Sequence, residues 1–179
     1  MSFKLSTKVA YYPTLLFNVL REKFGVTKWY HAIDDTVILG ALPFRNVAKK
    51  LITEYNIKGV VSMNELYEMK FFCPTKNEWS NMGVEQINLP TIDYSVPSLT
   101  DIRKGVDFIN HKRDEKSTVY VHCKAGRTRS ATLVAAYLCN RYNYSPEEAV
   151  EEIRKKRSHI YVAKRHILAL HKFVDSSHN

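Results

Sequence analysis

The hydrophobic positions of the chain form short continuous runs that alternate with longer stretches of helical spacing. Four runs are apolar or β-branched and end at Gly, Pro or polar residues, as strands do: residues 37–39, 59–63, 85–89 and 118–122. Helical spacing predicts helices over residues 44–55, 76–82, 98–112, 127–142, 145–156 and 164–175. The alternation predicts an α/β fold with a small central sheet of four to five strands and helices on both faces.

The chain contains no break at which a second domain could begin. Its 179 residues fit one domain, and they include no internal repeat, low-complexity tract or long Gly/Ser linker. We therefore divide the chain into an N-terminal segment, residues 1–28, and a single domain, residues 29–179.

The N-terminal segment is basic and amphipathic. Its first 21 residues carry Lys4, Lys8 and Arg21 but no acidic residue, and they include the apolar run 9–20. This composition predicts a mitochondrial targeting sequence or a segment that lies on a membrane surface, although a helix that docks on the domain would show the same pattern. The apolar run is too short to span a bilayer.

Composition and charge narrow the classes of function. The chain is 45% hydrophobic and 25% charged, as ordinary globular proteins are, which excludes disorder. Its formal net charge of +9 favours nucleic acid, phosphorylated small molecules or anionic membranes as partners. Because no nucleic-acid-binding module is recognisable, we do not expect nucleic acid. The basic run 154–157 suits a solvated helix face or a surface that faces anionic lipid, and nothing predicts the oligomeric state.

The cysteines and histidines do not predict a metal site. Cys73, Cys123 and Cys139 show no Cys-x-x-Cys pair and no zinc-type spacing with histidine, so we expect no metal, no other cofactor and a reducing compartment. Cys73 and Cys139 lie in apolar surroundings and are expected to be core residues.

Residues 119–131 carry the side chains best suited to phosphate chemistry. They run from a predicted strand into a predicted helix and contain the pattern Cys-x5-Arg, from Cys123 to Arg129, followed by Ser130. The amides of such a loop and the N-terminus of the helix form an anion site. Gly126 permits the tight bend. The positive field should lower the pKa of Cys123 and make it a nucleophile at neutral pH.

The neighbours of Cys123 have roles that follow from their chemistry. Arg129 can hold two phosphoryl oxygens, and Ser130 can donate a hydrogen bond to the sulfur when it leaves. We expect His122 to orient the loop through hydrogen bonds rather than to act as a base. Lys124 and Arg127 add positive charge that suits a substrate with a second negative group.

The pattern His122-Cys123-x5-Arg129-Ser130 resembles the active-site motif of the cysteine-dependent dual-specificity phosphatases. Other segments look like the mitochondrial branch of that family, which acts on phosphatidylglycerophosphate: residues 12–16, 29–31, 39–43, 63–65, 83–86, 134–138 and 145–150. The resemblance implies the cysteine-phosphatase fold, with a mixed sheet. It also implies metal-independent hydrolysis of the terminal phosphate monoester through a cysteinyl-phosphate, which yields phosphatidylglycerol for cardiolipin synthesis.

The resemblance also places the protein and its substrate. It implies a peripheral protein on the matrix side of the mitochondrial inner membrane, with an anionic phospholipid as substrate and a phosphoprotein as a further possible partner. The implied substrate-binding residues are Lys124, Ala125, Gly126, Arg127 and Thr128 of the phosphate loop, and Glu65, Tyr67 and Glu68 of a substrate loop. By residue type alone, the two glutamates would be solvated charges.

The general acid must come from a loop that faces Cys123, because an alkoxide is a poor leaving group until it is protonated. Asp93 follows a predicted strand, lies 30 residues before Cys123 and matches the acid loop of the family. Asp101 is the nearest rival, but its place in the first turn of a predicted helix suits capping.

Other functions remain as alternatives. A phosphoinositide phosphatase or a protein phosphatase that acts on Tyr, Ser and Thr would use the same fold and motif. An idle phosphate-binding module would not need Cys, Arg and acid together, and an arsenate reductase would need resolving cysteines that Cys73 and Cys139 are poorly suited to provide.

Overall fold

The chain folds around one five-stranded sheet. The computed structural model describes residues 2–176, with side chains from residue 9 onward, so the side chains of Lys4 and Lys8 lie outside the described residues. The strands are β1 (Tyr30–Ala32), β2 (Val37–Gly40), β3 (Ile57–Ser62), β4 (Glu85–Asn88) and β5 (Thr118–His122). The helices are α1 (Ser2–Lys23), α2 (Arg45–Tyr55), α3 (Leu66–Met69), α4 (Lys76–Asn81), α5 (Leu99–Asp114), α6 (Arg129–Tyr142), α7 (Pro146–Lys156) and α8 (Lys164–Asp175).

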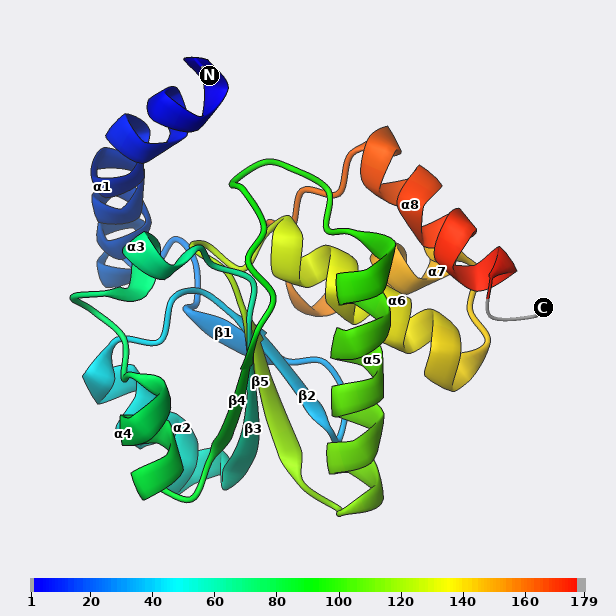
Figure 1. The fold of residues 1–179 in the computed structure, drawn as a ribbon, viewed down its shortest axis with the longest axis horizontal. Coiled ribbons are helices and arrows are strands. Elements are labelled where there is room, and N and C mark those ends of the chain that lie inside the picture. Colours follow the sequence, from blue (N-terminus) through cyan, green and yellow to red (C-terminus); the bar gives the residue numbers. More distant parts are fainter. Residues whose placement is uncertain (1, 177–179) are drawn as a thin grey trace.

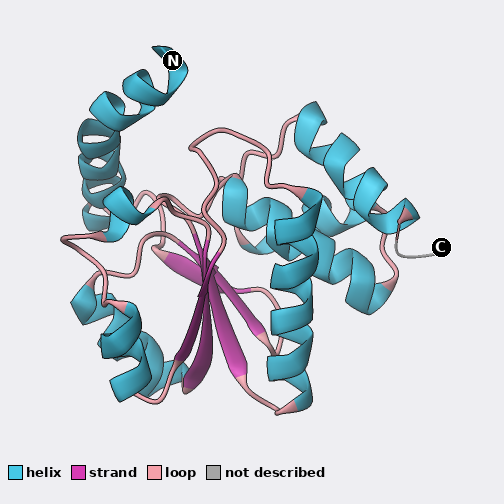
Figure 2. Ribbon diagram, viewed as in Figure 1, coloured by secondary structure: helices cyan, strands magenta, loops and turns pink. Residues whose placement is uncertain are grey.

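The strand order across the sheet is β1-β2-β5-β3-β4 (Figure 1). β1 pairs with β2 in the antiparallel sense, and the other three pairings are parallel, so the sheet is mixed. Figure 2 shows α5 and α6 against one face, with α7 and α8 beside α6, and α2 and α4 against the other. This arrangement confirms the predicted fold class.

Alternating side chains on the strands build one apolar cluster on each face of the sheet, because successive residues of a strand point to opposite sides. Val61 of β3 packs in the cluster that contains Leu133 of α6. Its neighbour Val60 packs with Leu51 of α2 and Trp79 of α4. The two clusters pack on opposite faces of the sheet and so fix the positions of its strand ends.

The carboxyl ends of the four parallel strands meet at one edge of the sheet, where ligands usually bind in α/β proteins. The loops that follow β2, β3, β4 and β5 begin there, and β5 lies between β2 and β3. β5 leads directly into the loop 123–128 and then into α6. The phosphate loop predicted from the sequence therefore starts near the centre of this edge.

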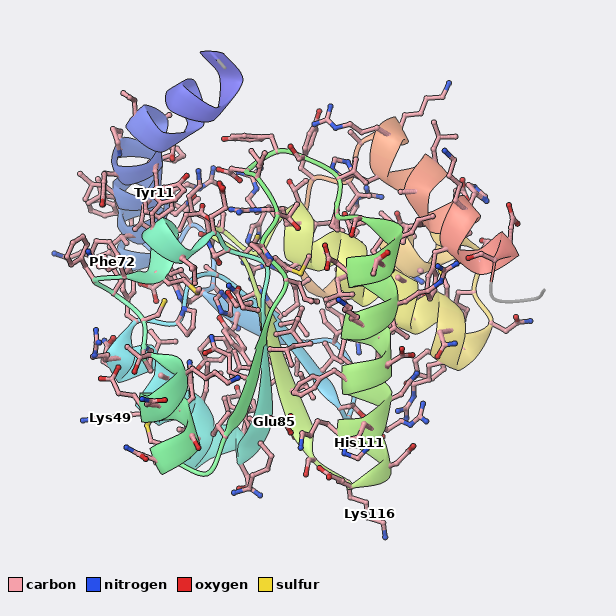
Figure 3. The ribbon with its side chains drawn as sticks, viewed as in Figure 1. Tyr11, Lys49, Phe72, Glu85, His111 and Lys116 are labelled. Atoms are coloured by element: carbon pink, nitrogen blue, oxygen red, sulfur yellow. The ribbon has the colours of Figure 1, made fainter. Side chains whose placement is uncertain are left out.

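The N-terminal helix α1 packs on the domain beside the same edge (Figure 1). Tyr11 and Leu15 are buried in a cluster with Trp29, Leu42 and Cys73. The Tyr11 hydroxyl donates to the Glu68 carbonyl at 2.6 Å, which ties α1 to α3 (Figure 3). The segment thus docks as a helix, which is one of the arrangements its pattern allows. Within the described residues, no helix combines the length and the apolar character that crossing a membrane requires.

The structure adds two short elements and moves many of the predicted boundaries by one or two residues. β1 and α3, of three and four residues, were not predicted because each is too short to show a period. The prediction that a helix begins at residue 127 is wrong, since α6 begins at Arg129. Thr128 has φ −122° and ψ −72°, and Gly126 has φ +63°, so the loop keeps a non-helical path up to the helix.

Candidate active site

The loop 123–128 folds back against the end of β2. Gly126 has φ +63°, a conformation that favours glycine. A Cβ at this position would lie 2.4 Å from the carbonyl carbon and oxygen of Gly40, which leaves no room for a side chain. The close approach fixes the loop against the sheet edge, with the N-terminus of α6 directly after it.

Arg157 holds the loop from behind. Its side chain is 1% exposed, and it donates from Nε to the Gly126 carbonyl at 2.8 Å and from Nη2 to the Ala125 carbonyl at 3.0 Å. Two backbone amides elsewhere in the chain donate to the carbonyls of Lys124 and Arg127. Because these carbonyls are engaged on the outside, the amides of the loop are left to face its interior, which is the arrangement of an anion-binding nest.

Cys123 lies at the base of this loop. Its Sγ accepts a hydrogen bond from the Ser130 hydroxyl at 3.2 Å. Burial alone would raise the pKa of the thiol, but the charge of Arg129 and hydrogen bonds from Ser130 outweigh burial, and the pKa of Cys123 is lowered below its ordinary value. A larger thiolate fraction makes Cys123 a stronger nucleophile at neutral pH.

Arg129 is the first residue of α6 and is fully buried. Its Nη1 and Nη2 atoms donate to the two carboxylate oxygens of Glu68 at 2.8 and 3.1 Å, and Nη1 also donates to the Thr91 carbonyl at 2.8 Å. Burial disfavours the charge, but Cys123 and Glu68 together raise the pKa of Arg129, so it stays a cation. Its buried Nε has no hydrogen-bond partner in the described part of the chain. A phosphoryl oxygen in the loop would supply that acceptor.

Asp93 reaches the loop from the segment that follows β4. Its Oδ1 lies 3.0 Å from Nη2 of Arg129, and its Oδ2 accepts from Nζ of Lys124. Lys124 also donates to the Thr14 hydroxyl of α1 at 2.9 Å. Asp101 instead pairs with the Ser98 hydroxyl at the start of α5, as expected of a capping residue. The structure therefore places Asp93 beside the nucleophile's loop and leaves its rival outside.

These elements enclose a cavity of about 270 Å³ at the sheet edge. The lining includes Cys123 at the base and residues from α1, from the Asp93 loop and from the segment between α7 and α8. The lining residues are Thr14, Phe17, Asn18, Asp93, Tyr94, Cys123, Lys124, Ala125, Arg127, Thr128 and Tyr161. Six of the residues proposed from the sequence thus line one cavity, and Gly126, Arg129 and Ser130 support it from below.

The three residues assigned to a substrate loop do not line this cavity. Glu68 is fully buried, and its carboxylate holds Arg129 and accepts from the Asn64 amide at 3.0 Å. The residue-type expectation of a solvated charge is therefore wrong for Glu68. Glu65 is the N-cap residue of α3 and forms its capping box with Glu68, and the ring of Tyr67 packs edge-on against Tyr11. Their roles in binding substrate stay predictions.

His122 supports the loop by packing. Its ring is fully buried and stacks on Tyr120, with centroids 5.7 Å apart, and burial lowers its pKa to about 3. Its backbone carbonyl accepts from the Met63 amide at 2.9 Å. A contact with the Cys123 backbone opposes this fall in pKa, and the role of the ring in orienting the loop stays a prediction.

Sequence reasoning missed Arg157 and the wall that α1 contributes. Arg157 belongs to the run 154–157, which was expected to be a solvated face or a surface for lipid, yet it is almost wholly buried. Its position after the capped helix 146–156 was the only available signal. Thr14, Phe17 and Asn18 line the cavity, and nothing in their residue types indicates this. Within the described residues, no group of three His, Cys, Asp or Glu side chains forms a metal site.

Comparison with known proteins assigns the class of enzyme that this geometry indicates. Residues 42–176 match the dual specificity phosphatase catalytic domain, so the chain belongs to that family and is a cysteine-based phosphatase. Phosphatidylglycerophosphatase and protein-tyrosine phosphatase 1 of Rattus norvegicus is 49% identical over 93% of this chain and 88% of its own. The protein of the same name from Homo sapiens is 48% identical over 87% of this chain and 79% of its own.

Solved structures agree with this assignment. A crystal structure of PTPMT1 in complex with PI(5)P has a TM-score of 0.81 and 49% identity, and the match covers 83% of this chain and 96% of that one. The resemblance to the dual-specificity phosphatases and the predicted phosphatase chemistry class are thereby confirmed.

Proposed function

We propose that this protein hydrolyses the terminal phosphate monoester of phosphatidylglycerophosphate to phosphatidylglycerol, and that it does so as a peripheral protein on the matrix side of the mitochondrial inner membrane. The observation that carries the substrate assignment is the cavity wall, which combines the cations Lys124 and Arg127 with the apolar rings of Phe17, Tyr94 and Tyr161. The names of relatives that are 48% and 49% identical support the same substrate.

The lining suits both phosphate groups of such a headgroup. The reacting monoester needs the loop amides and Arg129, while the second, diester phosphate of the headgroup needs additional positive charge. Arg127 supplies such a charge, and its Nε donates to the His159 carbonyl at 2.8 Å, which fixes the side chain at the cavity wall. Lys124 is a second cation in the same wall.

The first chemical step follows from the positions of three side chains. The Cys123 thiolate attacks phosphorus and forms an S–P bond as the P–O bond to glycerol breaks. Arg129 and the loop amides hold the nonbridging oxygens, and Nε of Arg129 gains the acceptor it lacks. Asp93 gives its proton to the departing glycerol oxygen. As the phosphoryl oxygens engage Arg129, they displace the Asp93 carboxylate from Nη2, 3.0 Å away, and the freed carboxylate takes up from solvent the proton that it then donates.

Water completes the cycle. Asp93, now a carboxylate, takes a proton from the water that attacks the cysteinyl-phosphate, and inorganic phosphate leaves. The Ser130 hydroxyl, 3.2 Å from the sulfur, stabilises the thiolate as the S–P bond breaks. Glu68 acts through Arg129, because its carboxylate fixes the plane of the guanidinium.

A substrate panel tests the proposal. Phosphatidylglycerophosphate, phosphoinositides and phosphopeptides, each dispersed in the same detergent, are compared by kcat/KM. We expect the highest value for phosphatidylglycerophosphate, and no turnover of any substrate by Cys123→Ser. Equal or higher values for a phosphopeptide would overturn the lipid assignment, and substantial activity of the serine variant would overturn the covalent mechanism.

A phosphoinositide is the second candidate substrate. The observation that favours it is the crystal structure of PTPMT1, 49% identical to this chain, in complex with PI(5)P. Protein-tyrosine phosphatase activity, which the names of the relatives also contain, is the remaining alternative. The same panel separates the three, because only the ranking of kcat/KM differs among them.

The role of Asp93 has its own test. Asp93→Asn should lower kcat strongly for alkyl phosphates, whose leaving group needs a proton, and much less for an activated aryl phosphate. Equal losses on both kinds of substrate would assign the acid to another residue. For the compartment, organelle fractionation should recover the protein with mitochondrial inner membranes, and recovery in the cytosol alone would contradict this part of the proposal.

A further inference from the structure

The helix α1 is apolar on two opposite faces. Tyr11 and Leu15 are buried against the domain. The opposite side, which we call the outer face of α1, is exposed. It comprises Val9 (71% exposed), Tyr12 (49%), Leu16 (58%) and Leu20 (42%), and Phe24 (74%) continues it directly after the last residue of the helix. Their spacing of three or four residues makes a continuous stripe along the helix.

This outer face carries almost no charge. The charged residues between positions 9 and 24 are Arg21, Glu22 and Lys23, and all three lie in the last turn or just before it. A surface helix of a water-exposed protein normally presents a polar side to solvent, and a helix that is apolar all round is normally covered. Large contiguous apolar patches mark protein or membrane interaction sites. The outer face of α1 is therefore expected to contact a partner or a membrane.

The stripe is continuous with the rim of the catalytic cavity. Phe17, 55% exposed, lines the cavity from α1, next in sequence to Leu16 of the outer face. Tyr94 and Tyr161, 49% and 56% exposed, line it from two other segments. Tyr94 has φ +64°, which is strained for a bulky residue. Aromatic rings of this kind are enriched where one end of a side chain is apolar and the other is wet.

Cations flank this apolar surface. Arg21, Lys23 and Lys28 follow the stripe, against the single acid Glu22. On the other side of the cavity, Arg165 donates to the Tyr94 carbonyl at 2.8 Å and is exposed. An apolar strip bordered by cations fits an anionic bilayer, which offers acyl chains to the rings and headgroup charge to the cations.

We propose that the outer face of α1, together with Phe17, Tyr94 and Tyr161, is the surface that seats this protein on an anionic bilayer and sets the cavity mouth at headgroup level. This inference rests on the proposed function, because it supplies the route by which a lipid headgroup reaches Cys123 from the membrane. A second copy of the chain fits this surface less well, since a symmetric contact would bring like charges together.

Vesicle sedimentation tests the surface directly. Wild type and the double variant Leu16→Gln, Leu20→Gln are mixed with phosphatidylcholine vesicles that contain or lack phosphatidylglycerol. Neither leucine lines the cavity or is buried. We expect wild type to bind the anionic vesicles more tightly than the neutral ones, and the double variant to lose about tenfold in affinity for each leucine. High salt should remove the preference for anionic vesicles.

The matched control is Leu168→Gln, against the single variant Leu16→Gln. Both leucines lie on helices and are 53% and 58% exposed, but Leu168 belongs to α8 and not to the stripe. Leu168→Gln should bind vesicles as wild type does. If it weakens binding as much as Leu16→Gln, or if the double variant binds unchanged, the assignment of the surface is wrong. It is also wrong if wild type is a dimer without vesicles and the double variant is a monomer.

Two activity measurements separate this inference from the proposed function. Hydrolysis of a water-soluble aryl phosphate should be equal in wild type and in the double variant, since the chemistry is untouched. Detergent-dispersed phosphatidylglycerophosphate tests the function alone: failure of wild type on this substrate overturns the function. Full activity there, with equal rates for wild type and double variant on vesicle-borne substrate, would overturn the surface and leave the function standing.

Discussion

Two arginines of this molecule are almost completely withdrawn from water, and their surroundings differ in kind. Arg129 meets the carboxylates of Glu68 and Asp93, and its pKa is raised. Arg157 meets the carbonyls of Ala125, Gly126 and Lys28 and the ring of His31. Within the described residues it forms no ion pair with a carboxylate, and burial lowers its pKa to about 10.

The difference separates two tasks that one residue type performs around the same loop. The charge of Arg129 is balanced by carboxylates that also orient its side chain, so that its unpaired Nε can donate to a phosphoryl oxygen. Arg157 has no carboxylate partner among the described residues and instead donates to the backbone carbonyls of the loop. Because these carbonyls point toward Arg157, the loop amides point toward the anion site. The Cys123 thiolate is the anion that favours the charge of both arginines. Nucleophile and loop are therefore electrostatically interdependent.

The largest expected effect is on catalysis at Arg129. Arg129→Lys keeps a cation for Glu68 but loses the planar fork, so kcat on an aryl phosphate should fall by about 10³-fold. Thermal unfolding should show only a modest shift, because the buried carboxylate keeps a partner. A kcat within tenfold of wild type would mean that the loop amides alone hold the phosphoryl group.

Arg157→Met should affect stability more than chemistry. It leaves several buried acceptors without a donor, each worth about 1–3 kcal/mol, so urea denaturation should show a loss of about 3 kcal/mol or more. kcat should fall by about tenfold, because the loop loses its outer anchor. Arg157→Lys, which can satisfy part of this set, is the folded variant for comparison. If it matches wild type in kcat and stability, the fork of Arg157 has no special part in holding the loop.

The positive charge around the loop should affect how the alkylation of Cys123 depends on pH. Because the pKa of Cys123 is lowered, iodoacetamide should label it at a lower pH than an ordinary thiol, and inorganic phosphate should protect it. Burial raises the pKa of Cys73 and raises that of Cys139 to about 12, so these thiols should stay unlabelled there. Mass spectrometry of the digested protein identifies the labelled site. Arg157→Lys should keep the profile, whereas Arg129→Lys should shift labelling to higher pH.

The smallest expected effect is an acid-linked loss of stability. Burial lowers the pKa of His31 and His159 to about 4 and that of His122 to about 3, below the ordinary 6.5. Between these values the unfolded chain binds more protons than the folded one, so the free energy of unfolding should fall as the pH drops from about 6.5 toward 4. Urea titrations at several pH values measure the slope.

His31→Gln sharpens this test, because glutamine removes the titration and can still accept from Arg157, 2.9 Å from the His31 Nδ1. The slope should become shallower in this variant. His111→Gln, at an exposed position of α5, is the control and should leave the slope as it is. An unchanged slope in His31→Gln would show that acid acts elsewhere in the fold.

How much of the fold could be predicted depended on the length of each element. β5 and α8 match their predicted ranges end for end, because each has a clear period and clear borders. β1 and α3 are held by contacts with neighbouring elements and not by a period of their own. The sequence pattern of such a short segment does not indicate the tertiary contacts that support it.

The candidate site divides in the same way. Cys123, Arg129 and Ser130 stand in one short motif, and the structure brings Asp93 to them from the loop after β4. Arg157 escaped prediction because burial of a single residue in a basic run is decided by packing at a distance. Glu68 was indicated by resemblance alone, and its residue type argued for solvent.

The contact between Thr14 and Lys124 bears on how the protein could be matured. A presequence that is cut off after import normally takes no part in the finished enzyme, but here the same stretch supplies a hydroxyl to a loop lysine and three residues to the cavity wall. Cleavage beyond Lys23 would open the cavity on one side and strip Tyr11 from Glu68. Any cut compatible with the site as folded must therefore fall before Tyr11, because the rest of this helix is part of the catalytic site.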